Sequence, residues 1–335
     1  MSRPPTGHAR SRRRLLLGAA AVAALPLAAV AEPAAFPVPE RPVRIVVPAP
    51  PGGPADILGR ALGNFLSQSL GVPVIIDSKP GGASVPAALA VAHAAPDGHT
   101  ILLTINTTHT QVPHLFAKPP YDPFKDFTPL TQVYRNGSVL LVHPSVPAND
   151  LGELIAYSRA SGPLAAGSPG PGTNGHLYIE MLDRQYGARL NHIPYKGSSD
   201  ASRDLIGGFV QVLFDSPATA IPNVKAGLAK AVAVTGTLRF KELPDVRTGH
   251  EQGFPALDIT GWMGFFGPAG MPRETVEKLN TELVAAIRRP EIRQQFEPFG
   301  VELTGTTAQE FAAIVKADYE TWGRIIKETG VRIDQ

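Results

Sequence analysis

Residues 167–176, GSPGPGTNGH, have the types and spacing of an anion-binding turn. A G-x-G-x-x-G pattern begins at Gly170, and in dinucleotide-binding proteins such a turn holds a pyrophosphate with backbone amides at a helix N-terminus. That motif also requires an acidic residue about 20 positions further on, at the end of the next strand. Here the corresponding strand ends with Tyr195 and Lys196. We therefore reject a nicotinamide cofactor, expect no other cofactor, and retain the anion site.

A second glycine-rich turn, PAPPGGPAD at residues 48–56, follows an earlier apolar run and leads directly into a helical pattern. Gly52 and Gly53 would let backbone amides approach a ligand. Either turn alone is explained as simply by glycines that supply a positive φ. Two matching turns, one in each half of the chain, favour anion binding at two helix N-termini.

The sequence lacks the residues that catalytic and metal-binding sites require. The chain has no cysteine, which excludes thiol catalysis, disulfides and cysteine-ligated metals. Neither an H-E-x-x-H, a G-x-S-x-G nor a Walker sequence occurs, and the nine histidines show no metal-ligand spacing. We expect structural or solvated roles for His109 in a loop, His176 at a helix start and His192 in a strand. The sequence therefore predicts a protein without catalytic activity and without a bound metal.

Two series of alternating strands and helices must position these turns. Short β-branched runs alternate with helical patterns, which predicts parallel α/β sheets, and the length suggests about two domains. Strands are expected at VRIVVP (43–48), VPVIID (72–77), TILLTI (100–105), SVLLVHP (138–144), LAAG, LNHIPY, VQVLFD and KAVAVTG. Because ligands bind beyond the carboxyl ends of such strands, the hydroxyl-rich loop 106–111 and Asp215 join the two turns as site candidates.

The C-terminal region returns to amphipathic helix. Thr307 and Glu310 form an S/T-x-x-E capping box for the last helix. Trp322 falls on its apolar face, which predicts a core position.

The first 31 residues resemble an export signal. A basic start precedes an apolar run from Leu15, and an A-x-A site ends at Ala31, which predicts cleavage before Glu32. The run is short for a membrane span and is interrupted by Pro26. Arginines at 12–14 also fit a twin-arginine signal, so the general secretory and twin-arginine routes both remain open.

Five of the 31 basic residues lie in this segment, with none of the 29 acidic ones. The mature chain would be slightly acidic, so no basic patch remains to indicate nucleic-acid binding, and we expect no nucleic-acid partner. With no cysteine for a lipid anchor and no later apolar run of span length, we expect the exported protein to be free in the periplasm. We also expect a monomer.

Many further motifs resemble one family. They occur in order over residues 37–334: RPVRIVVPAPPGGPADILGRALGNFLSQSLGVPVIIDSKPGGAS, AAPDGHTILL, KPPYDPFKDFTPLTQV, IPYKGSSDASRDLIGG, VQVLFDSPATAIPNVKAG and GFFGPAGMPRETVEKLN. The chain resembles the Bug family, the periplasmic substrate-binding proteins of tripartite tricarboxylate transporters.

The resemblance implies a two-lobed, type II-like periplasmic binding fold, with each lobe a mostly parallel sheet flanked by helices. It implies a cleft between the lobes that binds a small carboxylate and delivers it to the membrane components of a tripartite tricarboxylate transporter. Two alternatives remain open: a ligand sensor that signals to a membrane sensor kinase, and an exported hydrolase, which has the least support. Lobe 1 is expected at about 33–134 plus 262–335, and lobe 2 at about 135–261.

The resemblance also implies which residues bind the ligand. Backbone contacts, partly through water, are expected from the first turn. The second turn is expected to line the opposite wall, with further contacts from a hydroxyl loop, a Y-K-G turn and an acidic strand end. These are Gly52, Gly53, Ala55, Thr107, Thr108, Ser168, Gly170, Thr173, Asn174, Tyr195, Lys196 and Asp215. The second turn departs from the family pattern at Pro169 and Pro171, which concerns the far end of the ligand rather than the fold.

Asp215 has two readings. It could cap the helix that starts at Ser216 and Pro217, or it could select the ligand by repelling a second carboxylate. The sequence leaves both open.

Overall fold

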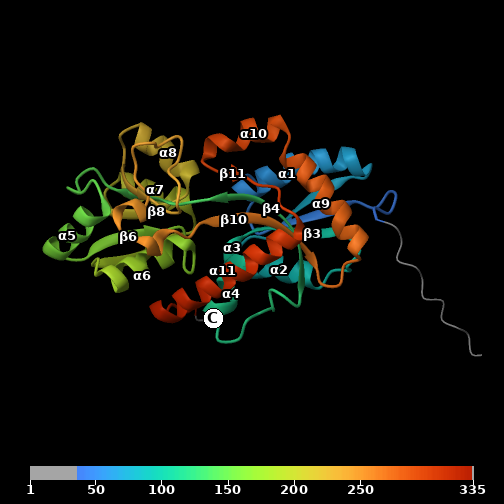
Figure 1. Cartoon of the computed structure of the whole chain (residues 1–335), viewed down its shortest axis with the longest axis horizontal. Helices are drawn as coiled ribbons and strands as arrows, with labels where there is room; N and C mark the ends of the chain where they lie inside the picture. Colours follow the sequence, from blue (N-terminus) through green and yellow to red (C-terminus); the bar gives the residue numbers. More distant parts are fainter. Residues whose placement is uncertain (1–35, 334–335) are drawn as a thin grey trace, which may run out of the picture. The chain divides into compact units, whose positions relative to one another are not determined.

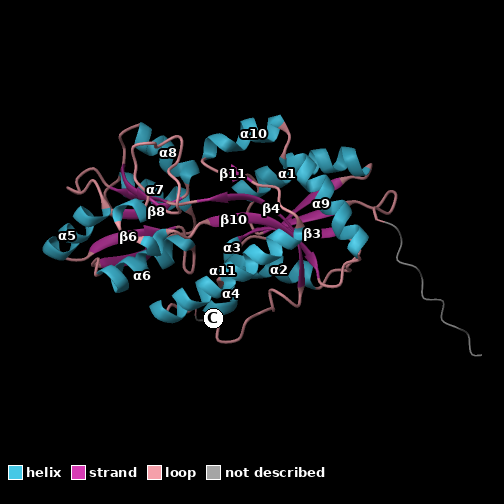
Figure 2. Ribbon diagram, viewed as in Figure 1, coloured by secondary structure: helices cyan, strands magenta, loops and turns pink. Residues whose placement is uncertain are grey.

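The structure is a computed structural model that describes residues 36–333. The expected export signal lies outside the described residues. Two β-sheets form the framework, and helices cover both (Figures 1 and 2). The chain passes from the first sheet to the second between Asn136 and Val139, and it returns to the first at Gly261.

The first sheet has six strands in the order β11-β4-β10-β3-β1-β2. Its strands are β1 (Val43–Val47), β2 (Val74–Ser78), β3 (Thr100–Ile105), β4 (Phe127–Asn136), β10 (Gly261–Pro268) and β11 (Glu302–Leu303). β1 pairs in parallel with β2 and β3, whereas β10 runs antiparallel to β3 and β4. The sheet is therefore mixed rather than mostly parallel, because β4 carries the chain towards the second sheet and β10 brings it back.

The second sheet has five strands in the order β7-β6-β8-β5-β9. They are β5 (Val139–Val142), β6 (Leu164–Ser168), β7 (Leu190–Pro194), β8 (Val212–Asp215) and β9 (Lys230–Val234). β6 is parallel to β7 and β8, and β5 is antiparallel to β8 and β9. This sheet is also mixed, since β5 enters it in the direction set by the crossing.

The helices follow the strands closely. They are α1 (Pro54–Leu70), α2 (Val85–Ala92), α3 (Asn106–Thr110), α4 (Val112–Leu115), α5 (Leu151–Ser161), α6 (Asn174–Tyr186), α7 (Ser198–Ile206), α8 (Pro217–Lys225), α9 (Arg273–Ile287), α10 (Pro290–Phe296) and α11 (Ala308–Thr329). Short 3₁₀ turns are η1 (Gly82–Ser84), η2 (His250–Gln252), η3 (Pro255–Leu257) and η4 (Glu297–Phe299). Local signals fix their ends: α1 and α6 stop at Gly71 and Gly187, both in the left-handed conformation that glycine adopts without strain.

Both faces of each sheet are buried. In β5, Leu140 and Val142 pack into a cluster with α5 and α6, whereas Val139 and Leu141 pack with α7 and α8 on the opposite face. The same alternation divides β1 between two clusters of the first sheet. This period-2 burial on both faces explains why the strands read as continuous apolar runs.

Helix α11 packs on elements of both sheets. Phe311 and Val315 belong to a cluster with β1 and β3, and Trp322 and Ile325 pack with Tyr178 of α6. The predicted capping box at its start is present, and the prediction that Trp322 is a core residue is confirmed, because it has no exposed surface.

Two local predictions are wrong. Our strand prediction omits β4, whose sequence FTPLTQVYRN mixes polar and apolar residues without clear alternation. Residues 106–110, expected as a loop, form the short helix α3, and all five side chains are buried. His109 is accordingly neither in a loop nor solvated. Its ring stacks on Phe266 at 3.7 Å between centroids, and burial lowers its pKa to about 3.

Candidate ligand-binding cleft

A cavity of about 520 Å³ lies where the carboxyl ends of strands from both sheets meet helix N-termini. It is lined by the starts of α1, α3, α6, α7 and α8, by the adjoining ends of β4 and β10, and by η4. Six of the twelve predicted site residues line it: Gly52, Ala55, Thr107, Thr173, Asn174 and Asp215. The structure thus brings together both glycine-rich turns, the polar residues after β3 and the acidic end of β8.

The other six predicted residues are not among those that line the cavity. Gly53 precedes α1 as its N-cap, and Ser168 and Gly170 lie within the second turn. Thr108 is fully buried and its hydroxyl pairs with Thr104 at 2.6 Å. The remaining two lie after β7. The Tyr195 hydroxyl donates to Asp204, and Lys196 is exposed.

The first turn is held by a charged side chain. Asp56 is 2% exposed, and its Oδ2 accepts hydrogen bonds from the Gly52 amide at 2.9 Å and from Arg60 Nε at 3.0 Å. The Arg60 guanidinium, followed by the Gly52 amide, lowers the pKa of Asp56. This clamp holds Gly52 at a φ of 83°, where a side chain would be strained. Asp56, in the first turn of α1, thus contacts the glycine-rich turn directly.

The second turn is held by neutral groups. The Thr173 hydroxyl donates to the Gly170 carbonyl at 2.7 Å, and the Gly172 amide donates to His176 Nδ1 at 2.9 Å. A hydroxyl has a single hydrogen, so Thr173 cannot also donate to a ligand carboxylate. Its hydroxyl therefore shapes the turn, and the residue lines the cavity as the N-cap of α6. A contact between Thr173 and the solute stays a prediction.

Two stacked histidines, His176 and His192, contact the second turn. The rings of His176 and His192 stack at 3.8 Å between centroids, and His192 Nε2 lies 2.7 Å from the Ser168 hydroxyl. Burial lowers the pKa of each histidine to about 4, with a further contribution from His192 at His176. Both rings are therefore neutral at pH 7. Their roles are structural, as the sequence led us to expect.

Asn174 links α6 to α3 across the cavity. Its Oδ1 accepts hydrogen bonds from Asn106 Nδ2 at 3.1 Å and from Gln111 Nε2. With that oxygen occupied, the Nδ2 group of Asn174 remains as a donor at the cavity wall. Gly261 permits this approach, because a Cβ there would lie 3.1 Å from Asn174 Nδ2 and 3.3 Å from Asn136 Oδ1.

Backbone amides at the starts of α1 and α6 are available to a ligand. The first amides of a helix have no carbonyl partner within the helix. In the described part of the chain, no acceptor contacts the amides of Ala55, Asn174 or Gly175. All three residues line the cavity, and the helix dipoles place partial positive charge there.

The remaining wall is apolar. The sequence did not predict most of this apolar wall, because its residues come from segments far apart in the chain and share no recognisable motif. These residues are Ile57, Leu58, Tyr134, Phe214, Trp262, Met263, Phe296, Phe299 and Val301. Trp262 donates to Asp318 Oδ2 at 2.6 Å, which anchors this wall to α11. The cavity can therefore hold an anionic group at one wall and an apolar body at another.

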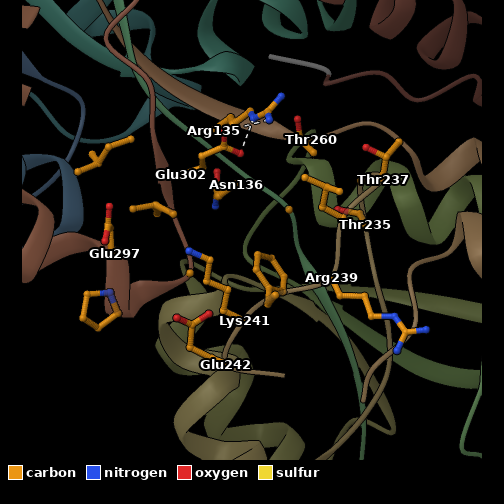
Figure 3. Close-up of a pocket in the computed structure, with 18 of the residues that line it drawn as sticks. Arg135, Asn136, Thr235, Thr237, Arg239, Lys241, Glu242, Thr260, Glu297 and Glu302 are labelled. Atoms are coloured by element: carbon orange, nitrogen blue, oxygen red, sulfur yellow. Dashed lines mark hydrogen bonds and ion pairs between the residues drawn. The ribbon is translucent and has the colours of Figure 1, made fainter. Parts of the chain in front are cut away.

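Figure 3 shows a larger cavity of about 850 Å³. Asn136 and Val301 line both the smaller cavity and this one. Its charged side chains largely pair with each other or with neighbours: Arg135 with Glu302 at 2.7 Å, Arg293 with Glu297 and Arg239 with Glu251. No helix of eight or more residues among the described elements begins at its wall. Among the described elements, the N-termini of helices of eight or more residues therefore line the smaller cavity and not the larger one.

Neither a metal centre nor a membrane span is found in residues 36–333. No group of three or more metal-ligating side chains occurs in this range. No helix there is both long and apolar enough to cross a bilayer.

Two mixed sheets joined by crossing strands, with a cavity lined by helix N-termini from both, define the two-lobed fold of periplasmic binding proteins. A family model described as "Tripartite tricarboxylate transporter family receptor" matches residues 58–331. The chain belongs to this family, which includes the Bug proteins, and it is a solute-binding protein of the tripartite tricarboxylate transport type.

Curated relatives match over most of their length. A UPF0065 protein in the tcbD–tcbE intergenic region of Pseudomonas sp. strain P51 is 34% identical and aligns with 97% of this chain and 96% of its own length. Protein BugT of Bordetella pertussis is 29% identical, with coverages of 88% and 91%.

Several solved structures are also similar to this chain over most of its length. An R. palustris protein solved with adipate has a TM-score of 0.79 and 31% identity, covering 88% of this chain and 99% of its own. The periplasmic binding protein BugD has a TM-score of 0.77 and 32% identity, with the same coverages. MatC from Rhodopseudomonas palustris with bound malate has a TM-score of 0.77 and 30% identity, covering 86% and 100%.

Proposed function

We propose that the chain binds one carboxylate group of a small solute between the N-termini of α1 and α6 and delivers the solute to the membrane components of a tripartite tricarboxylate transporter. One observation carries this proposal. Unpartnered amides from two helices in two different lobes line a single cavity. Helix N-termini bind carboxylates through such amides and through the dipole.

The charge of the cavity wall supports a backbone clamp. No lysine or arginine is among the residues that line it in the described part of the chain, so no side-chain cation competes with the amides for the anion. Asn174 Nδ2 and the Thr107 side chain add polar contacts. The relatives solved with adipate and with malate bind carboxylates, which agrees with this assignment.

We further propose that the chain performs no catalysis. Ser168 and His192 are the one pair that resembles a nucleophile and its base among the cleft's neighbouring residues. Ser168 has no exposed surface, so its hydroxyl cannot attack a solute in the cavity. Incubation of the purified protein with a bound solute should therefore return that solute unchanged.

Cleavage before Glu32, a periplasmic location and a monomeric state complete the proposal. The sequence of the first 31 residues and the membership in a family of periplasmic binding proteins support the first two. Of the sequence candidates, Gly53, Ser168 and Gly170 are proposed to support the clamp, whereas Thr108, Tyr195 and Lys196 have no proposed contact with the solute.

Calorimetry with carboxylate and amide forms of the same molecule tests the clamp. A carboxylate should bind at least about tenfold more tightly than its primary amide, because hydrogen bonds to a charged group contribute about 1.5–3 kcal/mol and neutral ones about 1 kcal/mol. A screen of mono- and dicarboxylates by thermal shift selects the pair. At 100 times its Kd a ligand stabilises the fold by about 2.7 kcal/mol, which such a screen detects. Equal affinities for the two forms would contradict the clamp.

A further inference from the structure

Gln111 is a buried polar side chain beside the cavity that the proposed function does not use. It has no exposed surface, and it is not among the residues that line the cavity. Its backbone is held between α3 and α4: its amide donates to the Thr107 carbonyl at 3.1 Å, and its carbonyl accepts from the amides of His114 and Leu115. Its side-chain Nε2 donates to Asn174 Oδ1 on the opposite lobe. The fold therefore fixes where this side-chain amide begins and what it contacts.

Asn174 receives two hydrogen bonds through one oxygen. Besides Gln111, Asn106 Nδ2 donates to Asn174 Oδ1 at 3.1 Å, and Asn106 is 3% exposed. A carbonyl oxygen has two lone pairs, so these two donors fill its capacity. Rotation of the Asn174 amide by half a turn would set its NH2 group against both donors and break both bonds. The two side chains of the first lobe thus fix which end of this amide remains for a solute.

The space beside Gly261 favours the same orientation of Asn174. A Cβ on Gly261 would lie 3.1 Å from Asn174 Nδ2, 3.3 Å from Asn136 Oδ1 and 3.4 Å from Asn106 Oδ1. An NH2 group that shares this space with two amide oxygens is electrostatically favourable, whereas a third oxygen there would be repelled. All four residues line the cavity.

The two lobes are in close contact around these hydrogen bonds. A Cβ on Gly172, in the second turn, would lie 2.5 Å from Leu115 Cδ1 of α4. Away from the crossing strands, one other side-chain hydrogen bond joins the lobes within residues 36–333, from Gln185 Nε2 to Glu328 at 3.4 Å, and both of its residues are exposed. The bonds to Asn174 are therefore the buried ones between the lobes, and they form only when α3 and α6 lie this close.

We propose that Gln111, together with Asn106, is a positioning residue of the carboxylate clamp: it holds the Asn174 amide so that Nδ2 donates to the solute. The inference rests on the proposed function, since it assumes that the solute presents a carboxylate to the N-terminus of α6. An ionised carboxylate accepts hydrogen bonds and donates none, so it binds an NH2 group and is repelled by an amide oxygen. A primary amide can pair with either end of Asn174. Gln111 therefore contributes to the preference for a carboxylate although it does not line the cavity.

Gln111→Met tests the inference, because methionine has nearly the length of glutamine and no donor. Calorimetry would use the best-binding of three pairs: pentanoate and pentanamide, benzoate and benzamide, and adipate and adipamide. Wild type should prefer the carboxylate at least about tenfold, as the clamp predicts. In Gln111→Met this preference should fall about threefold to tenfold, the effect of one lost hydrogen bond, with the loss mainly in carboxylate affinity. Gln111→Leu is a second variant with the same expected loss.

Gln185→Met is the matched control. Gln185 also donates from its side chain to the other lobe, but its acceptor is the exposed Glu328 and it does not line the cavity. This variant should keep the wild-type affinities for both members of the pair. An unchanged carboxylate preference in a folded Gln111→Met protein, or an equal fall in Gln185→Met, would overturn the inference.

The side-chain NH2 signals of the wild-type protein give a second readout that needs no substitution. In ¹H–¹⁵N spectra the Asn174 NH2 protons should shift downfield when the carboxylate is added, with the same Kd as the backbone amides of Asn174 and Gly175. A response of those backbone amides without any shift of the Asn174 NH2 would overturn the inference and leave the clamp intact. Equal affinities of wild type for a carboxylate and its amide would instead overturn the clamp, and with it the inference.

Discussion

The two turns that face the cavity hold helix N-termini in place by different means. The turn before α1 is fixed by the ionised Asp56, which bonds the Gly52 amide and Arg60. The turn before α6 is fixed by neutral hydroxyl, carbonyl and imidazole groups. The same anion-binding geometry is thus reached with a charge in one lobe and without one in the other. We therefore expect steric change, charge removal and mild acid to affect the two turns to different extents.

Substitution of a glycine in either turn by a larger residue should give the largest loss of solute affinity. A Cβ on Gly175 would lie 3.1 Å from the Phe214 carbonyl oxygen and 3.1 Å from Pro169 Cδ, so Gly175→Val should push the start of α6 away from β8. Overpacking of this kind costs about 1–3 kcal/mol, and where this cost falls on the bound form the affinity drops roughly fivefold to 150-fold. Gly53→Val meets the Pro50 carbonyl oxygen at 3.1 Å and should weaken binding similarly. Titration calorimetry measures both.

Gly152→Ala in α5 controls for the loss of a glycine. The nearest atom to its added Cβ is Asp150 Oδ1 at 3.4 Å, outside the cavity. It should leave affinity unchanged and raise stability by up to about 1 kcal/mol, since alanine favours a helix over glycine. Wild-type affinity in both valine variants would show that the solute binds elsewhere.

Removal of the Asp56 charge should affect only the turn before α1, and it should weaken solute binding less than the glycine-to-valine substitutions do. Asp56→Asn keeps one acceptor but loses the charge that strengthens its hydrogen bonds, so the free energy of unfolding should fall by about 1 kcal/mol, with weaker solute binding. Arg60→Gln is the comparison variant. The Arg60 side chain is exposed although it pairs with the buried Asp56, and its loss leaves the hydrogen bond from the Gly52 amide to Asp56 in place, so it should have the smaller effect. Chemical denaturation and calorimetry measure the two quantities. A larger loss in Arg60→Gln would contradict the assignment of Asp56 as the clamp.

Mild acid should separate the two turns by pH. Histidines 176 and 192 have pKa values lowered by burial from 6.5 to about 4, so between these values the unfolded chain binds protons that the folded chain does not. Stability therefore falls as pH decreases from about 6.5 to 4. Asp56, with a pKa below its usual 3.8, contributes stability that is lost only below that value. Glu180, 3.8 Å from His176 Nε2, is the nearest acidic group.

The melting temperature as a function of pH checks this prediction. Wild type should lose stability progressively between pH 6.5 and 4, and His192→Gln should reduce the slope in that window. A slope that is unchanged in His192→Gln would show that the stacked imidazoles do not support the α6 turn.

The sequence predicted the features that depend on residues close together in the chain, such as the edges of single strands and the glycine-rich turns. Apolar runs identified β1 and β3 within a residue of their ends, and the glycine-rich turns pointed to the helix N-termini that line the cavity. The mixed strand directions escaped prediction because they depend on where the chain crosses between sheets. β4 was missed because its burial comes from partners distant in sequence, β10 and β11. The direction of a hydroxyl, as at Thr173, likewise depends on the folded turn.

A solute titration followed by amide NMR tests whether one carboxylate contacts both helix N-termini. Uniformly ¹⁵N-labelled, deuterated protein would be titrated with a carboxylate selected by thermal shift. The amides of Ala55, Asn174 and Gly175 should shift together, with one common Kd, because one carboxylate contacts both helices. Shifts confined to one of the two turns, or centred on Arg135, Arg239 and Lys241 of the larger cavity, would contradict a carboxylate clamp shared by the two lobes.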